Sequence, residues 1–546
     1  MTHLVEKKLE AIARAGEPDY EIMWGRIEKR LGHVRPITTR PGISGNKKKT
    51  IILAASVAIM TAVPVVASVH NSGWESLWNG QSSYNAIELG LGNRLDHTVT
   101  SGGIAMTLNG VATDDQRMNI LLTMDDTDLP AYDVVTFDRS QLASEKGVED
   151  GIQVQLKHVP EEGRLYGLAT VQNNLGDGRE RYQLTLDHLV FYKYTSVPVA
   201  IKPAQSQGKA VQLVGSPAKS IAIISTIREN NVLTVRYELN GVNDYLKHNP
   251  QLQLVSGDQV LKPQNSALLP SEKPNVLLRQ STFNISDADL AKARFELAAL
   301  EEAGRKEGSW RFDFKAAGKK AAQAIFAMTL NPDTVVNDSY MKFTELVVTP
   351  LEIRLMYDEK QNFPEPGQPL IQYETVKLIA DGRELDSGTG FNTTEDGRYY
   401  RRFELPSWYE QKAWGSVPIQ VILSGQKAQE RAEADHAVTL AQPSASKKTA
   451  TTEQHGATVT FTYYKDGKDL MVESASDNPL FGGITQSYLN INGERMFPEL
   501  NPTPPGGNGT NRKVERYVNV PNGDLTLNPF LYVWFDPKAT TVLQLQ

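Results

Sequence analysis

The chain has 546 residues, a net charge of −7 and no cysteine, and 40% of its residues are hydrophobic. Without cysteine, disulfides, thiolate metal sites and a cysteine nucleophile are excluded. The acidic balance gives no charge-based affinity for nucleic acid, so we expect no nucleic-acid partner.

Residues 1–49 form a basic N-terminal segment, with 11 Lys and Arg against 6 Asp and Glu. Apolar side chains recur at helical spacing in two stretches, which predicts two short amphipathic helices followed by a flexible tether. Their apolar faces carry Val5, Leu9 and Ile12 in the first helix, and Tyr20, Met23, Ile27 and Leu31 in the second. A segment of this length is too short to form a hydrophobic core of its own. We therefore expect these apolar faces to bind a cytoplasmic protein partner. Packing on the membrane surface or on each other is the alternative.

A predicted transmembrane helix over residues 50–69 follows. The stretch from Ile51 to Val69 carries no charge and is long enough to cross a bilayer. Basic residues stand in front of it, at Lys47, Lys48 and Lys49, and the next one is Arg94. This asymmetry predicts a single-pass plasma-membrane protein in the lipid bilayer, with its N-terminus cytoplasmic and its C-terminus extracellular.

Two questions about this helix stay open at the level of sequence. Trp74 and Trp78 either anchor the helix at the outer headgroups or are the first core residues of the next domain. The helix is also compatible with a cleaved signal peptide, because Val65 and Ala67 have the small-residue spacing of a cleavage site. The long, structured N-terminal segment favours the uncleaved anchor.

The remainder of the chain shows the alternating apolar pattern of half-buried strands. Hairpins are predicted in 103–124, 219–239, 340–360 and 457–476, the last with an Asp466-Gly467 turn. The fold class is therefore mainly β, with tandem immunoglobulin-like β-sandwiches outside the membrane. Composition shifts place the β domains at 70–205, 206–325, 326–442 and 450–546.

One helix is expected within the second β domain, over residues 286–303. Ser286 suits the N-cap, Asp289 the third helical position, and Leu290, Ala293, Leu297 and Leu300 recur at helical spacing.

No catalytic or metal-binding pattern stands out, so we predict that the protein is not an enzyme and has no cofactor. Ser216 and Lys219 have the S-x-x-K spacing and Ser476–Asn478 reads S-D-N, as in penicillin-binding enzymes. The stretch after Lys219 has a strand pattern, whereas that chemistry needs the serine at the start of a helix. No K-T-G follows Ser476 either.

The chain resembles a Gram-positive family that carries a domain of unknown function (forty-one seventy-nine) directly after a single span. The resemblance rests on the helical N-terminus, the stretch "KKKTIILAASVAIMTAVPVVAS" and the hairpin "TVTSGGIAMTLNGVATDDQRMNILLTM". The stretch from "GSWRFDFKAAGKK" to "LIADGRELDSGTG" is similar to the immunoglobulin-like domain found further along such proteins. The resemblance implies a membrane-bound anti-sigma factor whose partner is an extracytoplasmic-function sigma factor.

Two functions are therefore compatible with the sequence. In the first, the N-terminal segment holds a sigma factor in transcription regulation, and the outer β domains sense the state of the envelope. In the second, the protein is a surface-anchored binding or structural protein whose β domains contact a cell-wall or other envelope ligand.

Overall fold

We analysed a computed structural model of the chain. It describes residues 73–545, apart from 126–128, 151, 173–174, 176–177, 204–209, 230, 243–247, 272, 274, 331–340, 360–368, 389–391, 395–396, 407–408, 410–412, 433–436, 455 and 500–511. The predicted N-terminal helices and the predicted span lie outside the described residues. Within the described part of the chain, no helix has the length and apolar character needed to cross a bilayer.

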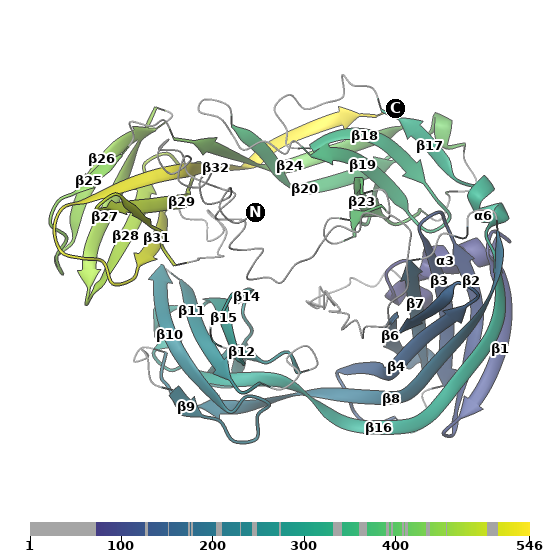
Figure 1. Ribbon diagram of the computed structural model, residues 1–546. Helices are drawn as coiled ribbons and strands as arrows, with labels where there is room; N and C mark the ends of the chain where they lie inside the picture. Colours follow the sequence, from purple (N-terminus) through teal and green to yellow (C-terminus); the bar gives the residue numbers. More distant parts are fainter. Residues whose placement is uncertain are drawn as a thin grey trace, which may run out of the picture. The chain divides into compact units, whose positions relative to one another are not determined.

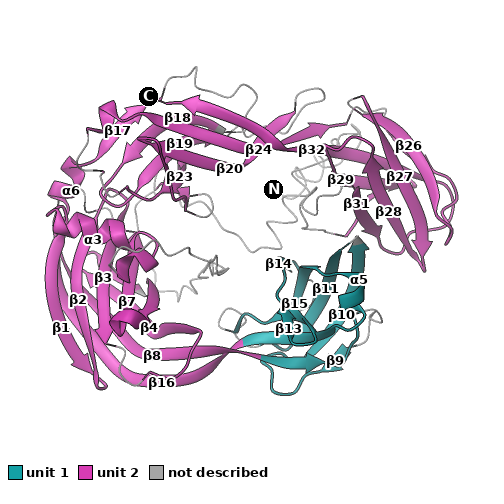
Figure 2. Ribbon diagram, turned by 180° about the vertical axis from the view of Figure 1, so that it is seen from behind, with its two compact units in different colours: residues 1–65, 196–299 teal, residues 66–195, 300–546 magenta. Residues whose placement is uncertain are grey.

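The protein is mainly β, as predicted, and divides into two compact units (Figure 2). Among described residues, one unit comprises 196–299, and the other comprises 73–195 and 300–545. The long strands β8 (Arg179–Val199) and β16 (Arg294–Ala317), labelled in Figure 1, each contribute residues to both units, which Figure 2 colours separately.

The larger unit begins with two short helices and a first sandwich, formed by residues 93–195 and 300–317. The helices are η1 (Gly73–Ser76) and α3 (Gly80–Glu88). One sheet has the order β1 (Asn93–Ser101), β2 (Ile104–Thr113), β3 (Arg117–Asp125), β7 (Arg164–Gln172) and β6 (Gln153–Val159), with η2 (Pro160–Glu162) before β7. The facing strands are β5 (Gly147–Asp150), β4 (Val134–Ser144), β8 and β16.

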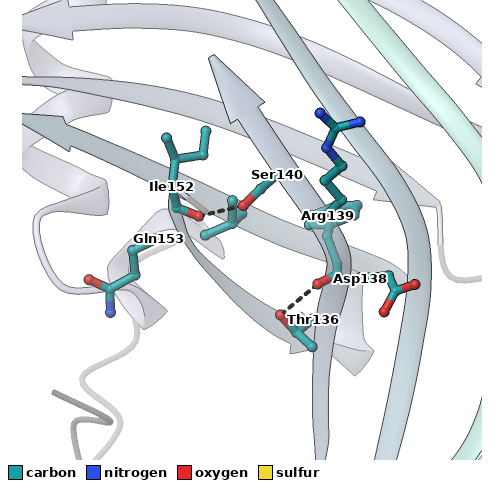
Figure 3. Close-up of a pocket in the computed structure, with 8 residues that line it drawn as sticks. Thr136, Asp138, Arg139, Ser140, Ile152 and Gln153 are labelled. Carbon is teal, nitrogen blue, oxygen red and sulfur yellow. Dashed lines mark hydrogen bonds between the residues drawn. The ribbon is translucent and has the colours of Figure 1, made fainter. Parts of the chain in front are cut away.

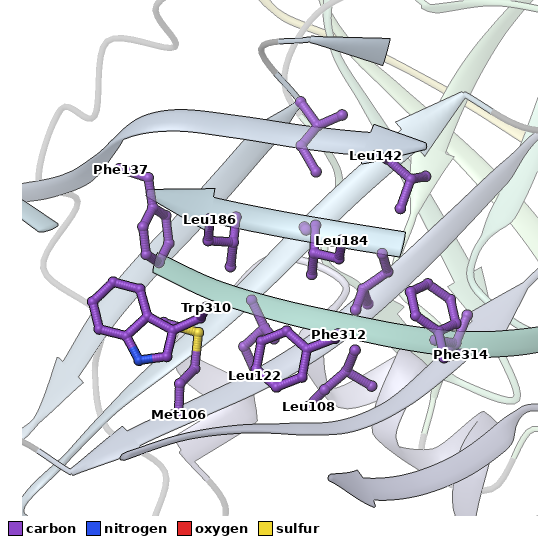
Figure 4. Close-up of a cluster of buried hydrophobic side chains, with 14 of the residues drawn as sticks. Met106, Leu108, Leu122, Phe137, Leu142, Leu184, Leu186, Trp310, Phe312 and Phe314 are labelled. Atoms are coloured by element: carbon purple, nitrogen blue, oxygen red, sulfur yellow. The ribbon is translucent and has the colours of Figure 1, made fainter. Parts of the chain in front are cut away.

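The core of the first sandwich is filled from both sheets (Figure 4). Met106, Leu108 and Leu122 come from one sheet, and Leu184 and Leu186 from the other. Alternate residues of β16 complete this core, namely Trp310, Phe312, Phe314 and Ala316. Residues 300–317, which the sequence placed in the second domain, therefore belong to the first sandwich.

The smaller unit is a second sandwich over residues 196–299. One sheet has the order β14 (Asn265–Leu269), β15 (Val276–Asn284), β11 (Val232–Asn240), β10 (Ser220–Glu229) and β9 (Ala210–Gln212). Facing it are β13 (Gln259–Leu261), β12 (Gln251–Ser256) and the start of β16. The core between them includes Tyr237, Phe283 and Phe295.

The helix predicted over 286–303 is wrong for most of its length. Ser286 does cap a helix, and its hydroxyl accepts a hydrogen bond from the Asp289 backbone N–H, but this helix, α5 (Asp287–Leu290), ends after one turn. β16 then pairs with β12, with Leu297 opposite Leu252. The sequence also alternates apolar residues there, and sheet pairing buries Phe295 and Leu297, so the tertiary contacts overrode the helical spacing.

The third sandwich, in the larger unit, is formed by residues 326–431 and the chain's last strand. One sheet has the order β17 (Phe326–Thr329), β18 (Met341–Val348), β19 (Ile353–Glu359), β23 (Tyr399–Phe403) and β22 (Asn392–Thr393). Facing it are β21 (Arg383–Leu385), β20 (Leu370–Ala380), β24 (Ile419–Arg431) and the end of β32 (Leu525–Gln544). The helices α6 (Lys319–Gln323) and η4 (Trp414–Ser416) complete this region.

The fourth sandwich comprises residues 432–536. One sheet has the order β26 (Lys448–Gln454), β27 (Ala457–Asp466), β28 (Asp469–Ser476) and β31 (Arg512–Tyr517). Facing it are β29 (Phe481–Ile491), β30 (Glu494–Met496), β25 (Val438–Leu440) and the start of β32. Because β32 also pairs with β24, the end of the predicted domain 450–546 lies in the third sandwich.

Candidate functional site

The turn between β2 and β3 presents three charged side chains in a fixed arrangement. The carboxylate of Asp114 accepts hydrogen bonds from the backbone N–H groups of Gln116 and Arg117, each at 2.8 Å. Such a side-chain-to-backbone contact holds a tight turn. The turn therefore fixes Asp114, Asp115 and Arg117 at one end of the first sandwich.

A matching turn joins β18 and β19 in the third sandwich. The hydroxyl of Thr349 accepts hydrogen bonds from the backbone N–H groups of Leu351, at 3.2 Å, and Glu352, at 3.1 Å. Glu352 and Arg354 follow at the start of the strand. The two turns meet, and the Thr349 hydroxyl donates to Asp114 at 3.0 Å.

These two turns form a network of ion pairs, which we call the charged junction: Asp114, Asp115, Arg117, Glu352 and Arg354. The guanidinium of Arg354 lies 2.5 Å from Asp114, 2.6 Å from Asp115 and 2.8 Å from Glu352. Arg117 pairs with Glu352 at 2.7 Å. Arg117 also donates a hydrogen bond to the hydroxyl of Tyr400 at 3.1 Å.

Four of the five side chains of the charged junction are buried, whereas that of Asp115 is 37% exposed. The side chains of Asp114 and Glu352 have no exposed surface, and those of Arg354 and Arg117 are 2% and 4% exposed. Burial lowers the pKa of Arg354 and of Arg117, but the neighbouring carboxylates outweigh it and the pKa of each is raised. Both guanidiniums are therefore charged at every physiological pH.

A further cation, Arg402, lies beside the junction. Burial lowers its pKa, and the charge of Arg117 adds to that effect, while Glu352 opposes it. The guanidinium of Arg402 lies 5.8 Å from the ring centre of Trp78, within the range of a cation–π contact.

This site is a contact between two turns of the chain, the one between β2 and β3 and the one between β18 and β19. The carboxylates of Asp114 and Glu352 are held by guanidinium groups of Arg354 and Arg117. Breaking a buried ion pair by removing one partner is strongly destabilising, which makes the arrangement of the two turns specific. The junction thus fixes the first sandwich against the third.

A separate open pocket of about 510 Å³ lies beside β4 and β6 (Figure 3). Its lining residues are Thr136, Phe137, Asp138, Arg139, Ser140, Ile152, Gln153 and Val154. The hydroxyl of Ser140 donates to the carbonyl of Ile152 at 2.7 Å, and Asp138 pairs with Arg305 at 2.8 Å. Ser140 and Asp138 are thus each held by a partner within the protein.

The structure describes few of the site residues predicted from sequence. The proposed partner-binding residues from Val5 to Leu31, and the anchor residues Lys47, Lys48, Lys49, Ile51 and Val69, lie outside the described residues. Trp74 is described and is 4% exposed. Its ring packs edge-on against Tyr166 at 4.7 Å between ring centres. Trp74 is therefore a core residue and is not available as a headgroup anchor.

The two stretches with penicillin-binding-enzyme spacing lack that geometry. The Ser216 hydroxyl accepts a hydrogen bond from the Ala218 backbone N–H, and Lys219 leads into strand β10, as its sequence pattern predicted. Ser476 ends strand β28, and its hydroxyl donates to the Thr458 carbonyl at 2.8 Å.

Sequence reasoning missed the charged junction. A signal was present: Glu352 and Arg354 interrupt the apolar run "VVTPLEIRLMY", in which charged residues at strand positions are unusual unless they are paired. Their partners, Asp114, Asp115 and Arg117, lie more than 200 residues earlier in the sequence. No sequence pattern indicates that these two sets of residues pair.

Residues 44–126 match the domain of unknown function DUF4179. The match covers the end of the predicted tether, the predicted span, α3 and strands β1 to β3. No curated protein matches the chain. Among solved structures, a conserved domain protein from Bacillus anthracis is similar, with 12% identity over 41% of this chain and 91% of that one, and a TM-score of 0.13.

Proposed function

We propose that this protein is a single-pass membrane regulator, an anti-sigma factor. In this proposal the N-terminal segment holds an extracytoplasmic-function sigma factor, and the outer β domains sense the state of the envelope. The observation that carries it is the position of Trp74: this side chain is buried in a core, only five residues after the last residue of the predicted span, Val69.

This closeness favours signalling over simple anchoring. A passive anchor needs no fixed connection to the domain that it carries, and a flexible linker is sufficient. Here, Trp74 is buried almost as soon as the predicted span ends. The DUF4179 match also runs through the predicted span into β3, so span and first hairpins recur together. The immunoglobulin-like assignment of the third sandwich remains part of the proposal.

Copurification tests the partner. The full chain, extracted in detergent, should copurify with the sigma factor encoded beside its gene. The double variant Ile27→Asp, Leu31→Asp should lose this partner, because charges on the apolar face oppose its burial. A matched control, Thr38→Asp, Thr39→Asp, places the same two charges in the predicted tether and should keep it. A parent chain that does not bind the sigma factor would contradict the proposal.

Thiol labelling tests the topology, since the chain has no cysteine of its own. In intact cells, a membrane-impermeant maleimide should label a Ser101→Cys variant and should not label a Ser44→Cys variant. After lysis, both variants should react. If the mature protein instead begins after the predicted span, the surface-anchored regulator is excluded and an exported β protein remains.

Deletion of residues 1–40 separates the proposal from the alternative of a surface-anchored binding or structural protein. An anti-sigma factor should lose its control of transcription with this deletion. A surface protein should keep its phenotype, because its β domains are intact.

A further inference from the structure

The chain segment from Gly73 onward is tightly packed against its neighbours. We call residues 73–91, which include η1 and α3, the strap. A side chain at Gly73 would place its Cβ 2.1 Å from the ring of Tyr166, and one at Gly80 would lie 2.4 Å from the carbonyl of Trp74. Real atoms do not approach so closely, so both positions need glycine.

One side of the strap packs on the first sandwich (Figure 1). Trp74, Leu77 and Ile87 share a buried cluster with Leu121 of β3 and Leu168 of β7. A hydrogen bond adds to this contact, because the amide of Asn119 donates to the hydroxyl of Ser83 at 2.9 Å.

Another side of the strap contacts the third sandwich. The carboxylate of Glu404 accepts a hydrogen bond from the backbone N–H of Asn79 at 2.9 Å, at the start of α3. A side chain at Gly388 would lie 2.9 Å from the ring of Trp78. Leu351, which lies in the turn between β18 and β19, belongs to the same buried cluster as Trp74.

The strap is therefore a third component of the joint between the first and third sandwiches, beside the charged junction. We propose that the strap couples the predicted span to this joint. Displacement of the chain at Gly73 would withdraw Trp74 from its cluster and Asn79 from Glu404, and Leu351 would become accessible. In this proposal the joint has the closed state described above and an open state, and the change between them links the outer domains to the span.

The signalling role of the strap rests on the proposed function, whereas its part in the joint is testable without any sigma factor. A reporter thiol detects opening, because a buried cysteine reacts only when the structure around it opens. Leu351→Cys reports on the joint, and Ala169→Cys, in β7, reports on the folding of the first sandwich. Both positions are 0% exposed.

Each reporter is placed in the full chain, purified in detergent, and its rate of reaction with a maleimide is measured. Adding Trp74→Ala should raise the rate at Leu351→Cys about tenfold and leave Ala169→Cys protected. Adding Glu404→Ala should raise the rate at Leu351→Cys in the same direction, because the strap loses its acceptor. The matched control Phe461→Ala truncates an aromatic ring that is 1% exposed in the fourth sandwich and should change neither rate.

The outcomes are decisive in each case. If Leu351→Cys stays as unreactive with Trp74→Ala and with Glu404→Ala as in the parent, the strap does not hold the joint and the proposal is overturned. If Trp74→Ala also exposes Ala169→Cys, the first sandwich has unfolded and the Glu404→Ala result decides. A positive thiol result without sigma-factor binding would keep the strap as a part of the joint and remove its signalling role together with the proposed function.

Discussion

Asp114 and Arg354 are 240 residues apart in the chain, yet the Oδ2 atom of Asp114 lies 2.5 Å from the Nη2 atom of Arg354. Neither side chain is more than 2% exposed. A buried charge without an opposite charge beside it is strongly destabilising. This pair therefore favours the one arrangement of the two turns in which Asp114 and Arg354 are in contact.

Removing the Arg354 side chain tests how much the charged junction contributes to the stability of the fold. We expect Arg354→Met to lower the free energy of unfolding by about 3–5 kcal/mol, because Asp114 and Glu352 would stay buried without their main counter-charge. Denaturant titration followed by circular dichroism measures this. The control is Arg305→Met, whose partner Asp138 is 45% exposed; its effect should stay below about 1 kcal/mol. Equal effects of the two substitutions would argue against a special role for the junction.

Glu515 should make the fourth sandwich less stable as the pH rises. Burial raises the pKa of Glu515, and Lys513 and the hydrogen bond from Ser487 offset this only in part. The unfolded chain therefore releases this proton at a lower pH than the folded one, so stability falls as the pH rises above the ordinary carboxyl value of 4.5.

The variant Glu515→Gln isolates this effect. It should unfold at a higher temperature than the parent at pH 7 and at a similar temperature at pH 4, because the amide cannot ionise. Calorimetry at both pH values measures the difference. The exposed Glu494→Gln, which removes a carboxylate at the tip of β30, should show no such pH-dependent gain. A parent whose stability in this range is independent of pH would contradict the assignment.

The position of β16 predicts which sandwich each of its halves supports. Trp310 is 0% exposed and donates from Nε1 to the Ile104 carbonyl at 3.0 Å. Trp310→Ala should cost about 3–5 kcal/mol and speed amide hydrogen exchange in β2 and β3. Phe283→Ala, in the second sandwich, should instead speed exchange in β10 and β11. Faster exchange in β10 with Trp310→Ala, and none in β2, would return residues 300–317 to the second domain.

The hairpin of β27 and β28 depends on one left-handed residue. Gly467 has a φ of 63°, and a Cβ there would meet no atom within 4 Å, so only backbone strain opposes a side chain. Gly467→Ala should therefore cost about 1 kcal/mol. Gly467→Asn should cost less, because asparagine tolerates this conformation. Thermal melts of both variants compare the two, and an equal loss would point to a cause other than φ.

The strands were largely predictable, because alternation of apolar residues is a local property. The hairpin of β2 and β3 follows from Met106 and Leu108 on one strand and Ile120 and Leu122 on the other, and all four are buried. The turn at Gly467 was predictable for another local reason, because an Asp-Gly pair favours the positive φ of a hairpin turn. Alternation failed at β16, where Leu290, Ala293 and Leu297 fit a helix as well as Ala293, Phe295 and Leu297 fit a strand.

The sequence by itself determined that the chain is mainly β, where its hairpins turn, and that cysteine chemistry has no part in it, since composition and short-range periodicity decide these properties. The tertiary structure alone decided that β16 is a strand, that its second half completes the first sandwich, and that Trp74 belongs to a core. It alone also joined Asp114 to Arg354. The physical reason is the same in each case: burial and ion pairing depend on partners that are distant in the sequence, and a local pattern does not identify those partners.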